Sequence, residues 1–406
     1  MIKKNLFTCA LLLTVFACSE NQKVAPRFLE LESPAKTAGA EPNLTLTHDG
    51  RALLSWIEQK NKDVDALNFA FKTGDSWSAP EQAQTGNNWF VNWADFPSMV
   101  VFNNGTILTH WLEKSASATF SYDVKMSISS DDGASWGQPF SPHNDGTTTE
   151  HGFVSIVPFG ADRALAVWLD GRNTASKNKN GAMTLRYAEI TDQGKIVAEG
   201  ELDSRVCDCC QTGLTVLPDG GAMVVYRDRA KGEIRDISYR IYKNKKWGPI
   251  QSIAKDGWEI AGCPVNGPAI ASEDETVAIG WFTGAQDTNR VQLRISQDSG
   301  QSFGPTIRIN GGEPLGRIDL VMLQDRSMLI VWMEYAEKDA AIRWTHILQD
   351  GTKKESGTLA QISAARASGF PRLVRTETEI IAAWTIAGDK PFIKTAALKI
   401  ADLIAR

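Results

Sequence analysis

The cysteines of this chain are unevenly placed, and three of them stand almost side by side. Cys207, Cys209 and Cys210 lie within four residues, and Cys263 follows 53 residues after Cys210. Outside the cytoplasm such cysteines usually form disulfides, and four of them allow three pairings. Thiolates are also soft ligands that favour zinc or cuprous copper, and His151 could add a nitrogen. The sequence therefore predicts that Cys263 shares a disulfide or a metal with the cluster, and leaves both open.

Arginines, carboxylates and aromatic residues recur in the same polar segments. Arginine grips a carboxylate through two hydrogen bonds, and an aromatic face stacks on a sugar ring. We therefore expect a site for a carbohydrate or another small anionic ligand. Its candidate residues are Trp93, Glu150, His151, Asp170, Arg172, Arg227, Asp228, Arg235 and Arg317. The alternative is that the arginines form salt bridges that brace long loops.

Asp95, between Trp93 and Pro97, is the candidate for acid–base catalysis. The alternative role for Asp95 is to cap the start of the following strand. The remaining histidines, His48, His110, His143 and His346, show no metal-ligand spacing, and we expect them to be structural.

One sequence pattern recurs seven times and must build the elements that position these residues. A turn signal such as Asp-Gly precedes a short apolar strand that ends in an aromatic residue. These aromatic residues are Trp56, Trp111, Trp168, Tyr226, Trp281, Trp332 and Trp384, at spacings of 51 to 58 residues. Repeats of this length made of short strands are typical of a β-propeller, whose blades bury their faces only against each other. We predict an all-β propeller of four-stranded blades.

The repeat also predicts where the candidate residues meet. Each aromatic strand would be the second strand, B, of a blade, preceded by an inner strand A, as at residues 97–102 and 152–157. In a propeller the B-to-C and D-to-A loops share one face. The candidate residues all fall in such loops or at the strand ends beside them, so we expect them on one face.

Two turns link this repeat to a known family. The segments Ser129–Trp136 and Ser296–Phe303 fit the pattern S-x-D-x-G-x-[ST]-[WF], which resembles the Asp-box of sialidase-like propellers. The resemblance implies that Asp131 and Asp298 are scaffold residues on the face away from the active site. It also implies an arginine cluster, an Asp acid–base and a Tyr nucleophile. The family's N-terminal arginine motif is absent, so these roles are not transferred residue by residue.

The number of blades follows from counting strands and turns. Seven aromatic strands stand against six box-like turns, which predicts seven blades, whereas known sialidases have six. The count agrees if residues 27–32, which alternate like a strand, complete the last blade beside residues 393–398. Such closure removes a free sheet edge.

The N-terminus indicates export. Residues 1–17 combine Lys3 and Lys4 with an apolar run and end before Cys18, which resembles a lipoprotein signal and lipidation site. The resemblance implies an outer-membrane lipoprotein of the cell envelope. We expect a tether at residues 18–42 that includes the closing strand, and the propeller at residues 43–406.

The net charge of the chain limits the classes of molecule that it is expected to bind. The chain after residue 17 has 41 Lys and Arg against 48 Asp and Glu, a net charge of −7, which argues against nucleic acid. We expect a monomer that meets the membrane only through its lipid. Two functions remain open: a sialidase-like propeller that binds a glycan, with hydrolysis by an exo-glycosidase mechanism undecided, or a non-catalytic binding or assembly lipoprotein whose cysteines are structural or hold metal.

Overall fold

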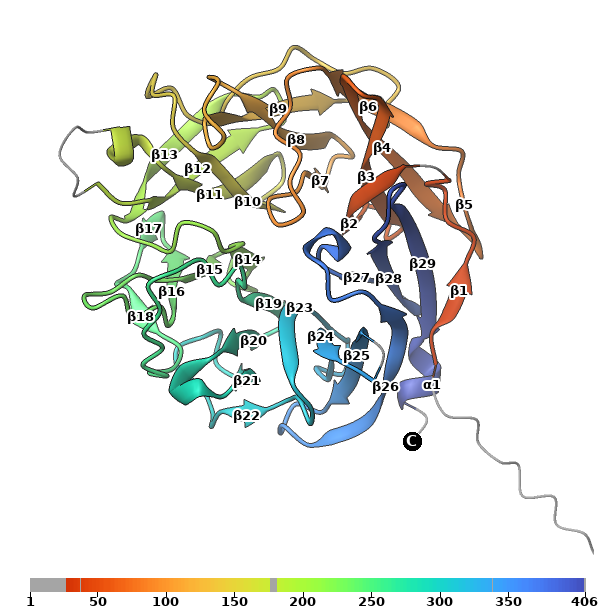
Figure 1. The fold of residues 1–406 in the computed structure, drawn as a ribbon, viewed down its shortest axis with the longest axis vertical. Coiled ribbons are helices and arrows are strands. Elements are labelled where there is room, and N and C mark those ends of the chain that lie inside the picture. Colours follow the sequence, from red (N-terminus) through yellow and green to blue (C-terminus); the bar gives the residue numbers. More distant parts are fainter. Residues whose placement is uncertain (1–26, 37, 176–180, 338, 405–406) are drawn as a thin grey trace, which may run out of the picture.

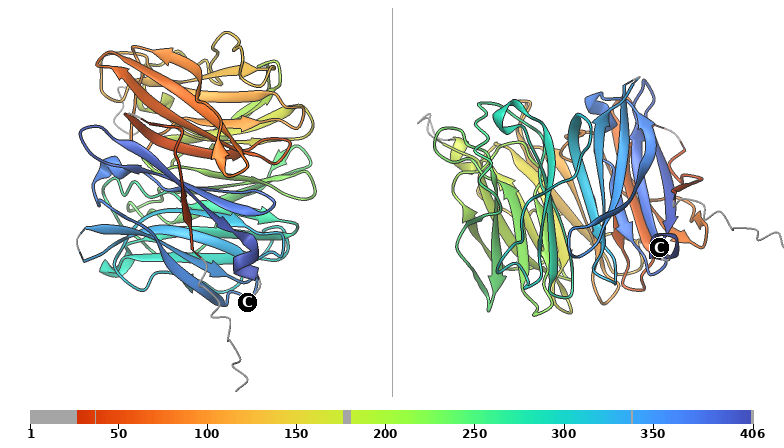
Figure 2. Two further views of the ribbon diagram at one scale, coloured as in Figure 1. Left: turned by 90° about the vertical axis from the view of Figure 1, so that its right-hand side faces the viewer. Right: turned by 90° about the horizontal axis from the view of Figure 1, so that it is seen from below.

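Seven antiparallel sheets surround a central axis in a computed structural model of the chain (Figure 1), which describes residues 27–36, 38–175, 181–337 and 339–404. The side views in Figure 2 show the sheets standing side by side as blades. The protein is thus an all-β, seven-bladed propeller, as the repeat predicts. The expected signal segment and Cys18 lie outside the described residues. Within the described ranges, no helix is long and apolar enough to cross a membrane.

The strands follow the repeat in chain order. Blades 1 to 3 contain β2 (Gly39–Leu46), β3 (Ala52–Asn61), β4 (Val64–Thr73), β5 (Ser76–Trp77) and β6 (Glu81–Gly86); β7 (Ser98–Val101), β8 (Ile107–Lys114) and β9 (Tyr122–Ser129); and β10 (His151–Pro158), β11 (Arg163–Asp170), β12 (Thr184–Thr191) and β13 (Ile196–Asp203). In blade 2 a single bridge between Met126 and Phe140 stands where the other blades have an outer strand.

The remaining blades are built in the same way. Blades 4 to 6 contain β14 (Gly213–Val216), β15 (Ala222–Arg227), β16 (Ile237–Lys243), β17 (Lys246–Trp247) and β18 (Gln251–Ser252); β19 (Ala269–Glu273), β20 (Thr276–Thr283), β21 (Arg290–Ser296) and β22 (Ile307–Arg308); and β23 (Pro314–Met322), β24 (Met328–Tyr335), β25 (Ala340–Ile347) and β26 (Lys353–Ile362). Blade 7 contains β27 (Arg372–Arg375), β28 (Glu379–Ile386), β29 (Phe392–Lys399) and β1 (Leu29–Leu31). Short helices are α1 (Ile400–Ile404) and three 3₁₀ turns, Arg172–Ala175, Ala285–Asp287 and Arg366–Ser368.

The propeller is closed by strand β1, which runs beside β29 at the outer edge of blade 7 (Figure 1). Its register pairs Leu29 with Ala397 and Leu31 with Thr395. An ion pair between Glu30 and Lys394, 2.8 Å long, lies along the same edge. The N-terminal strand thus covers an edge that would otherwise expose unpaired backbone groups.

Burial between blades explains why the aromatic position repeats. All seven repeated aromatic residues are buried. Six of them pack into a cluster formed with a neighbouring blade, and the seventh, Trp111, packs on the Trp89 ring. Trp56 of blade 1, for example, shares a cluster with Ile381 and Ala383 of blade 7. The core is therefore divided among the blade interfaces, as expected for a repeat whose units cannot bury their faces alone.

The two Asp-box-like turns use their polar atoms internally. Asp131 Oδ1 accepts a hydrogen bond from the Ser135 amide at 2.9 Å, and Asp298 Oδ1 accepts one from the Ser302 amide at 2.8 Å. Gly133 has a φ of 92°, and a Cβ there would lie 2.3 Å from the ring of Phe69 in blade 1. These contacts suit the scaffold role expected for both aspartates.

Several inner strands begin with a bulge in which a residue other than glycine takes a left-handed backbone. β10 shifts register between Gly152 and Ser155, with Phe153 at φ 54°. β23 shifts between Gly316 and Asp319, with Arg317 at φ 51°. Bulges of this kind re-aim side chains and cluster near functional sites. They lie at the starts of the inner strands, where the B strands of the same blades end.

Candidate functional site

The B-to-C and D-to-A connections lie on one face, which we call the loop face. The pairing of His151 at the start of β10 with Asp170 at the end of β11 sets this arrangement in blade 3. Asp95, Glu150 and the 207–210 segment precede inner strands and reach the same face. These connections therefore place Asp95, Glu150, His151, Asp170 and the 207–210 segment on the loop face.

The most distinctive group on the loop face joins Asp95, Tyr122 and Glu150. The Tyr122 hydroxyl lies 2.9 Å from Asp95 Oδ2 and 2.8 Å from Glu150 Oε1. A phenol carries one hydrogen, so it can donate in only one of these contacts, and the other requires a proton on a carboxyl group. Asp95 Oδ1 accepts the Phe153 amide at 2.7 Å, which leaves Oδ2 for that proton. The group can therefore hold a shared proton between two carboxyls.

The pKa values of this group are shifted by burial. Burial raises the pKa of Asp95 to about 8 and that of Glu150 to about 7, and the Asp208 carboxylate adds to the effect at Glu150. Burial and the two carboxyls raise the pKa of Tyr122 well above its usual value. A carboxyl with a pKa near neutrality can both donate and accept a proton at physiological pH, as general acid–base catalysis requires. Asp95 and Tyr122 are fully enclosed, whereas Glu150 is only half-buried.

Close packing fixes this group in place. The Phe90 ring stacks on Tyr122 with centroids 4.0 Å apart, and the exposed Phe120 touches Phe90 edge-on. A Cβ at Gly152 would lie 2.0 Å from Asp95 Oδ2, so only glycine leaves room for the carboxyl. An aromatic path thus leads from the surface at Phe120 to Tyr122.

A second buried cluster centres on two stacked histidines. The rings of His143 and His151 lie 4.0 Å apart and nearly parallel. Asp145 Oδ2 lies 3.2 Å from His143 Nδ1 and 3.1 Å from His151 Nε2. Burial, followed by the neighbouring His151, lowers the pKa of His143 to about 4. The histidines and carboxylates could ligate a metal, but a resident cation, Arg172, already occupies the cluster.

Arg172 supplies that positive charge. Its guanidinium binds Asp170 through two hydrogen bonds of 2.7 and 2.8 Å, and it lies 3.4 Å from Asp145. Asp123 approaches His151 Nδ1 from the other side at 3.5 Å. His143, which shows no metal-ligand spacing in the sequence, is brought onto His151 by the blade 2 loop and joins Asp123 and His151 in a group that could hold a metal.

Two other predicted anion binders, Arg227 and Arg317, donate hydrogen bonds to groups of the protein itself. Arg227 donates four hydrogen bonds to the backbone carbonyls of Asn266, Arg235 and Phe282, and its guanidinium covers the Trp258 ring. Arg317 donates to the carbonyls of Ala365 and Gly369 and lies over the Trp93 ring at 4.7 Å.

Burial, followed by the charge of Arg366, lowers the pKa of Arg317 to about 10. Trp93 also stacks on Phe370, and Asp228 accepts hydrogen bonds from Ser238 Oγ and the Arg229 amide. These contacts support the bracing role for both arginines.

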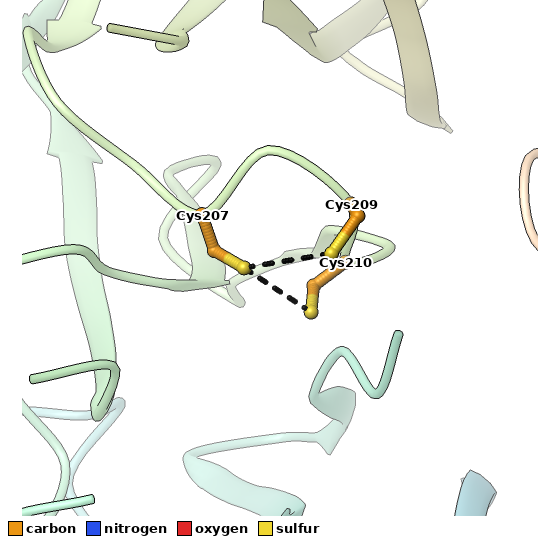
Figure 3. A group of neighbouring side chains, drawn as sticks. All are labelled: Cys207, Cys209 and Cys210. Carbon is orange, nitrogen blue, oxygen red and sulfur yellow. Dashed lines mark hydrogen bonds between the residues drawn. The ribbon is translucent and has the colours of Figure 1, made fainter. Parts of the chain in front are cut away.

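Cys207, Cys209 and Cys210 form a compact group of sulfurs, drawn in Figure 3. Cys207 Sγ lies 3.9 Å from Cys209 Sγ and 3.5 Å from Cys210 Sγ. Arg235 Nη1 donates to Cys207 Sγ at 3.2 Å, and Arg235 also pairs with Glu233. Hydrogen bonding with Cys209 and Cys210 holds the pKa of Cys207 well below its usual range. Three described thiols therefore converge beside a cation.

Cys263 stands apart from this group. It is exposed, and all four described cysteines carry free thiols, so the expected link between Cys263 and the cluster is absent from the structure. The register explains the difference. Cys210 precedes β14 by three residues, whereas Cys263 precedes β19 by six, so the two do not occupy equivalent positions at the axis.

A cavity of about 160 Å³ lies along the propeller axis and is lined by the inner strands of all seven blades. Its polar lining includes Ser155, Gln211 and the Asp319–Arg372 pair. On the loop face, Trp93, Phe96 and Phe370 pack at its edge. Asp95, Glu150 and the cysteines of the 207–210 segment do not line this cavity.

Sequence reasoning missed Tyr122, Asp123 and Asp145, and it did not foresee that His143 stacks on His151. Tyr122 carried one usable signal: the chain has six tyrosines, and Tyr122 stands where a B-to-C loop enters a strand. Its partners, Asp95 and Glu150, come from two different D-to-A loops. Whether the three residues touch depends on the paths of these loops in space, which the spacing along the sequence does not give.

Comparisons with known proteins bear on the fold. No protein-family model and no curated protein matches the chain. A protein of unknown function from Dyadobacter fermentans has 14% identity and a TM-score of 0.53, covering 92% of this chain and 98% of its own. A K499G mutant of NanB sialidase from Streptococcus pneumoniae has 9% identity and a TM-score of 0.50, with 93% of each chain covered.

An ulvan lyase of polysaccharide lyase family 25, solved with a bound sulfated glucuronic acid–rhamnose unit, is similar at 12% identity. Its TM-score is 0.50, and the match covers 78% of this chain and 80% of that one. At these identities the likeness shows the fold alone, which is a sialidase-like propeller. That fold is shared with proteins that act on glycans.

Proposed function

We propose that the loop face binds a glycan and that Glu150, with Tyr122 and Asp95 behind it, transfers a proton during cleavage of a glycosidic bond. The observation that carries this proposal is the Tyr122 hydroxyl held between two carboxyls whose pKa values lie near neutrality. A buried carboxyl costs free energy when it is ionised, which raises its pKa. Carboxyls whose pKa values are strongly shifted in this way cluster at functional sites.

Glu150 is the member of the group placed to meet a substrate, because it alone is partly exposed. In a hydrolysis, the Glu150 carboxyl gives its proton to the departing glycosidic oxygen while water adds to the anomeric carbon. The proton released by that water restores the carboxyl. Tyr122 and Asp95 act as positioning residues that hold the Glu150 carboxyl in place, whereas burial raises the pKa of Glu150 to about 7.

The bonding of the arginines favours a neutral glycan over an acidic one. Arg227 and Arg317 donate their hydrogen bonds to backbone carbonyls, and the charge of Arg172 is neutralised by Asp170. The Asp208 carboxylate also places negative charge near the site. Phe120, with more than half of its surface exposed, offers an aromatic face for a sugar ring at the end of the path to Tyr122.

The test is cleavage of a panel of neutral and acidic oligosaccharides, measured by the release of reducing ends. We expect Glu150→Gln to lower the rate roughly 100-fold or more while leaving binding intact, in line with the usual contribution of a general acid. Glu81→Gln, an exposed change on β6, is the matched control. The rate should also fall as pH rises through about 7, because Glu150 then loses its proton.

Binding without turnover by the unmodified chain would favour the alternative function, a non-catalytic glycan-binding propeller. Absence of both binding and turnover across the panel would contradict the proposal. Equal rates for Glu150→Gln and the unmodified chain would remove Glu150 from any catalytic role.

A further inference from the structure

We propose that Cys207, Cys209 and Cys210 bind one cuprous ion through three thiolates. The first support is geometric. The three sulfurs lie within 4.8 Å of one another, with Cys207 3.9 and 3.5 Å from its partners. A metal–sulfur bond of about 2.3 Å places ligand sulfurs roughly 3.8 to 4.0 Å apart, so the cluster is close to the size that a metal needs.

The number of ligands favours copper in its cuprous state. Structural zinc sites are closed by four protein ligands, whereas the sulfur group of the described residues has three members and Cys263 lies outside it. Soft thiolates select cuprous copper, which accepts three-coordinate geometry. An odd number of thiols also fits a disulfide poorly, because one of the three would be left unpaired.

The surroundings of the sulfurs supply the charge that such a complex needs. One cuprous ion bound by three thiolates carries a net charge of −2. Arg235, only 3% exposed, directs Nη1 at Cys207 Sγ at 3.2 Å, and its Nε has no hydrogen-bond partner among the described residues. A buried guanidinium with an unused donor is costly, and an anionic metal–thiolate complex beside it would offset that cost.

The backbone around the cluster holds the sulfurs in place and leaves a path of entry. The Cys207 amide donates to the Arg227 carbonyl, and the preceding Val206 bridges to Asp228. Cys207 and Cys210 are buried, whereas Cys209 is partly exposed. The ion would therefore reach the site past Cys209. Binding releases the protons that the thiols carry, so affinity should rise with pH.

The experiment uses the full chain, reduced and kept without oxygen, titrated with cuprous copper against a chromogenic chelator. We expect one ion per chain, a thiolate-to-metal absorption in the ultraviolet and three sulfur neighbours by X-ray absorption. Peptide mapping after alkylation should show Cys207, Cys209 and Cys210 protected by copper and Cys263 still modified. None of these readouts depends on glycan activity, so the two proposals fail separately.

Single serine variants locate the site. Cys207→Ser, Cys209→Ser and Cys210→Ser should each weaken copper binding 100-fold or more, whereas Cys263→Ser, the matched control, should not change it. Arg235→Gln should weaken binding 10- to 100-fold, as is typical when a residue that hydrogen-bonds to a metal ligand is replaced. Because Cys209 is partly exposed, its variant is the one least expected to disturb folding, which circular dichroism checks.

Three outcomes would overturn the proposal. The first is stoichiometric copper binding that survives in Cys209→Ser with the fold intact. The second is retention of stoichiometric zinc that cuprous copper does not displace. The third is a disulfide within the cluster together with no copper binding after reduction.

Discussion

At the scale of single residues, the protonation of the buried Asp95 carboxyl decides how Tyr122 and Glu150 are hydrogen-bonded. Its side chain is 1% exposed and yet carries two hydrogen-bond contacts, one to the Phe153 amide and one to Tyr122. Burial keeps it protonated near neutrality, so it can donate to Tyr122, which is then free to donate to Glu150. The three residues therefore act as one chain of hydrogen bonds rather than three separate groups.

The raised pKa of Asp95 makes folding stability depend on pH. The unfolded carboxyl ionises near pH 4, whereas the folded one holds its proton to about pH 8. The folded state thus binds more protons in this window, so this group's contribution to stability is present below pH 4 and is lost as pH rises towards 8. Glu150 acts with the same sign up to about pH 7.

Asp95→Asn should remove the Asp95 part of this dependence. Asparagine can still accept from Phe153 and donate to Tyr122. We expect its free energy of unfolding to improve relative to the unmodified chain, by on the order of 3 kcal/mol, between pH 5 and pH 8. Urea denaturation at both pH values measures this change, and parallel pH curves for the two chains would show that Asp95 is not protonated.

At the scale of elements, the bulge at the start of β10 builds the acid group. It turns the Phe153 amide towards Asp95 and requires Gly152, which leaves space for the carboxyl. The bulges in β2 and β23 occupy the corresponding place in their blades. A repeated local irregularity thus aims backbone donors and side chains at the loop face.

Gly152→Ala should break this arrangement. Its new methyl group would overlap Asp95 Oδ2, so we expect a loss of about 1 to 3 kcal/mol in the free energy of unfolding and a larger loss of activity. Gly388→Ala, where a Cβ meets no atom within 4 Å, is the control. Equal stability of the two variants in chemical denaturation would contradict the packing described here.

At the scale of the whole molecule, the seven inter-blade clusters make each blade depend on its neighbours, and β1 completes the ring. Its three paired residues join the start of the described chain to β29, near the C-terminus. Loss of this strand would expose an edge of blade 7. Loss of the adjoining Phe28 would also remove its ring contact with Trp344.

Deletion of residues 27–32 should therefore lower the melting temperature of the entire propeller in one transition, because the blades are coupled through their shared cores. Glu30→Ala is the control. It removes only the exposed pair with Lys394, and surface pairs contribute about 0 to 1 kcal/mol. A melting temperature equal to that of the control, measured by calorimetry, would mean that β1 does not close the ring energetically.

The sequence by itself determined the architecture of this protein. The turn and aromatic strand repeat locally, so the period and the alternation of apolar residues could be read without any long-range information. The same repeat placed Asp95, Glu150, Asp170 and the cysteines on one face, and the strand-like pattern of residues 27–32 predicted the partner of β29.

Only the tertiary structure decided which of these residues touch. Tyr122 meets Asp95 and Glu150 because three loops of different length converge there, and His143 stacks on His151 for the same reason. Arg227 and Arg317 turn inward to backbone carbonyls. Cys263 remains outside the sulfur group because the loops before the inner strands differ in length. Such contacts depend on the path of each loop in space, and a pattern of spacing along the chain does not contain that path.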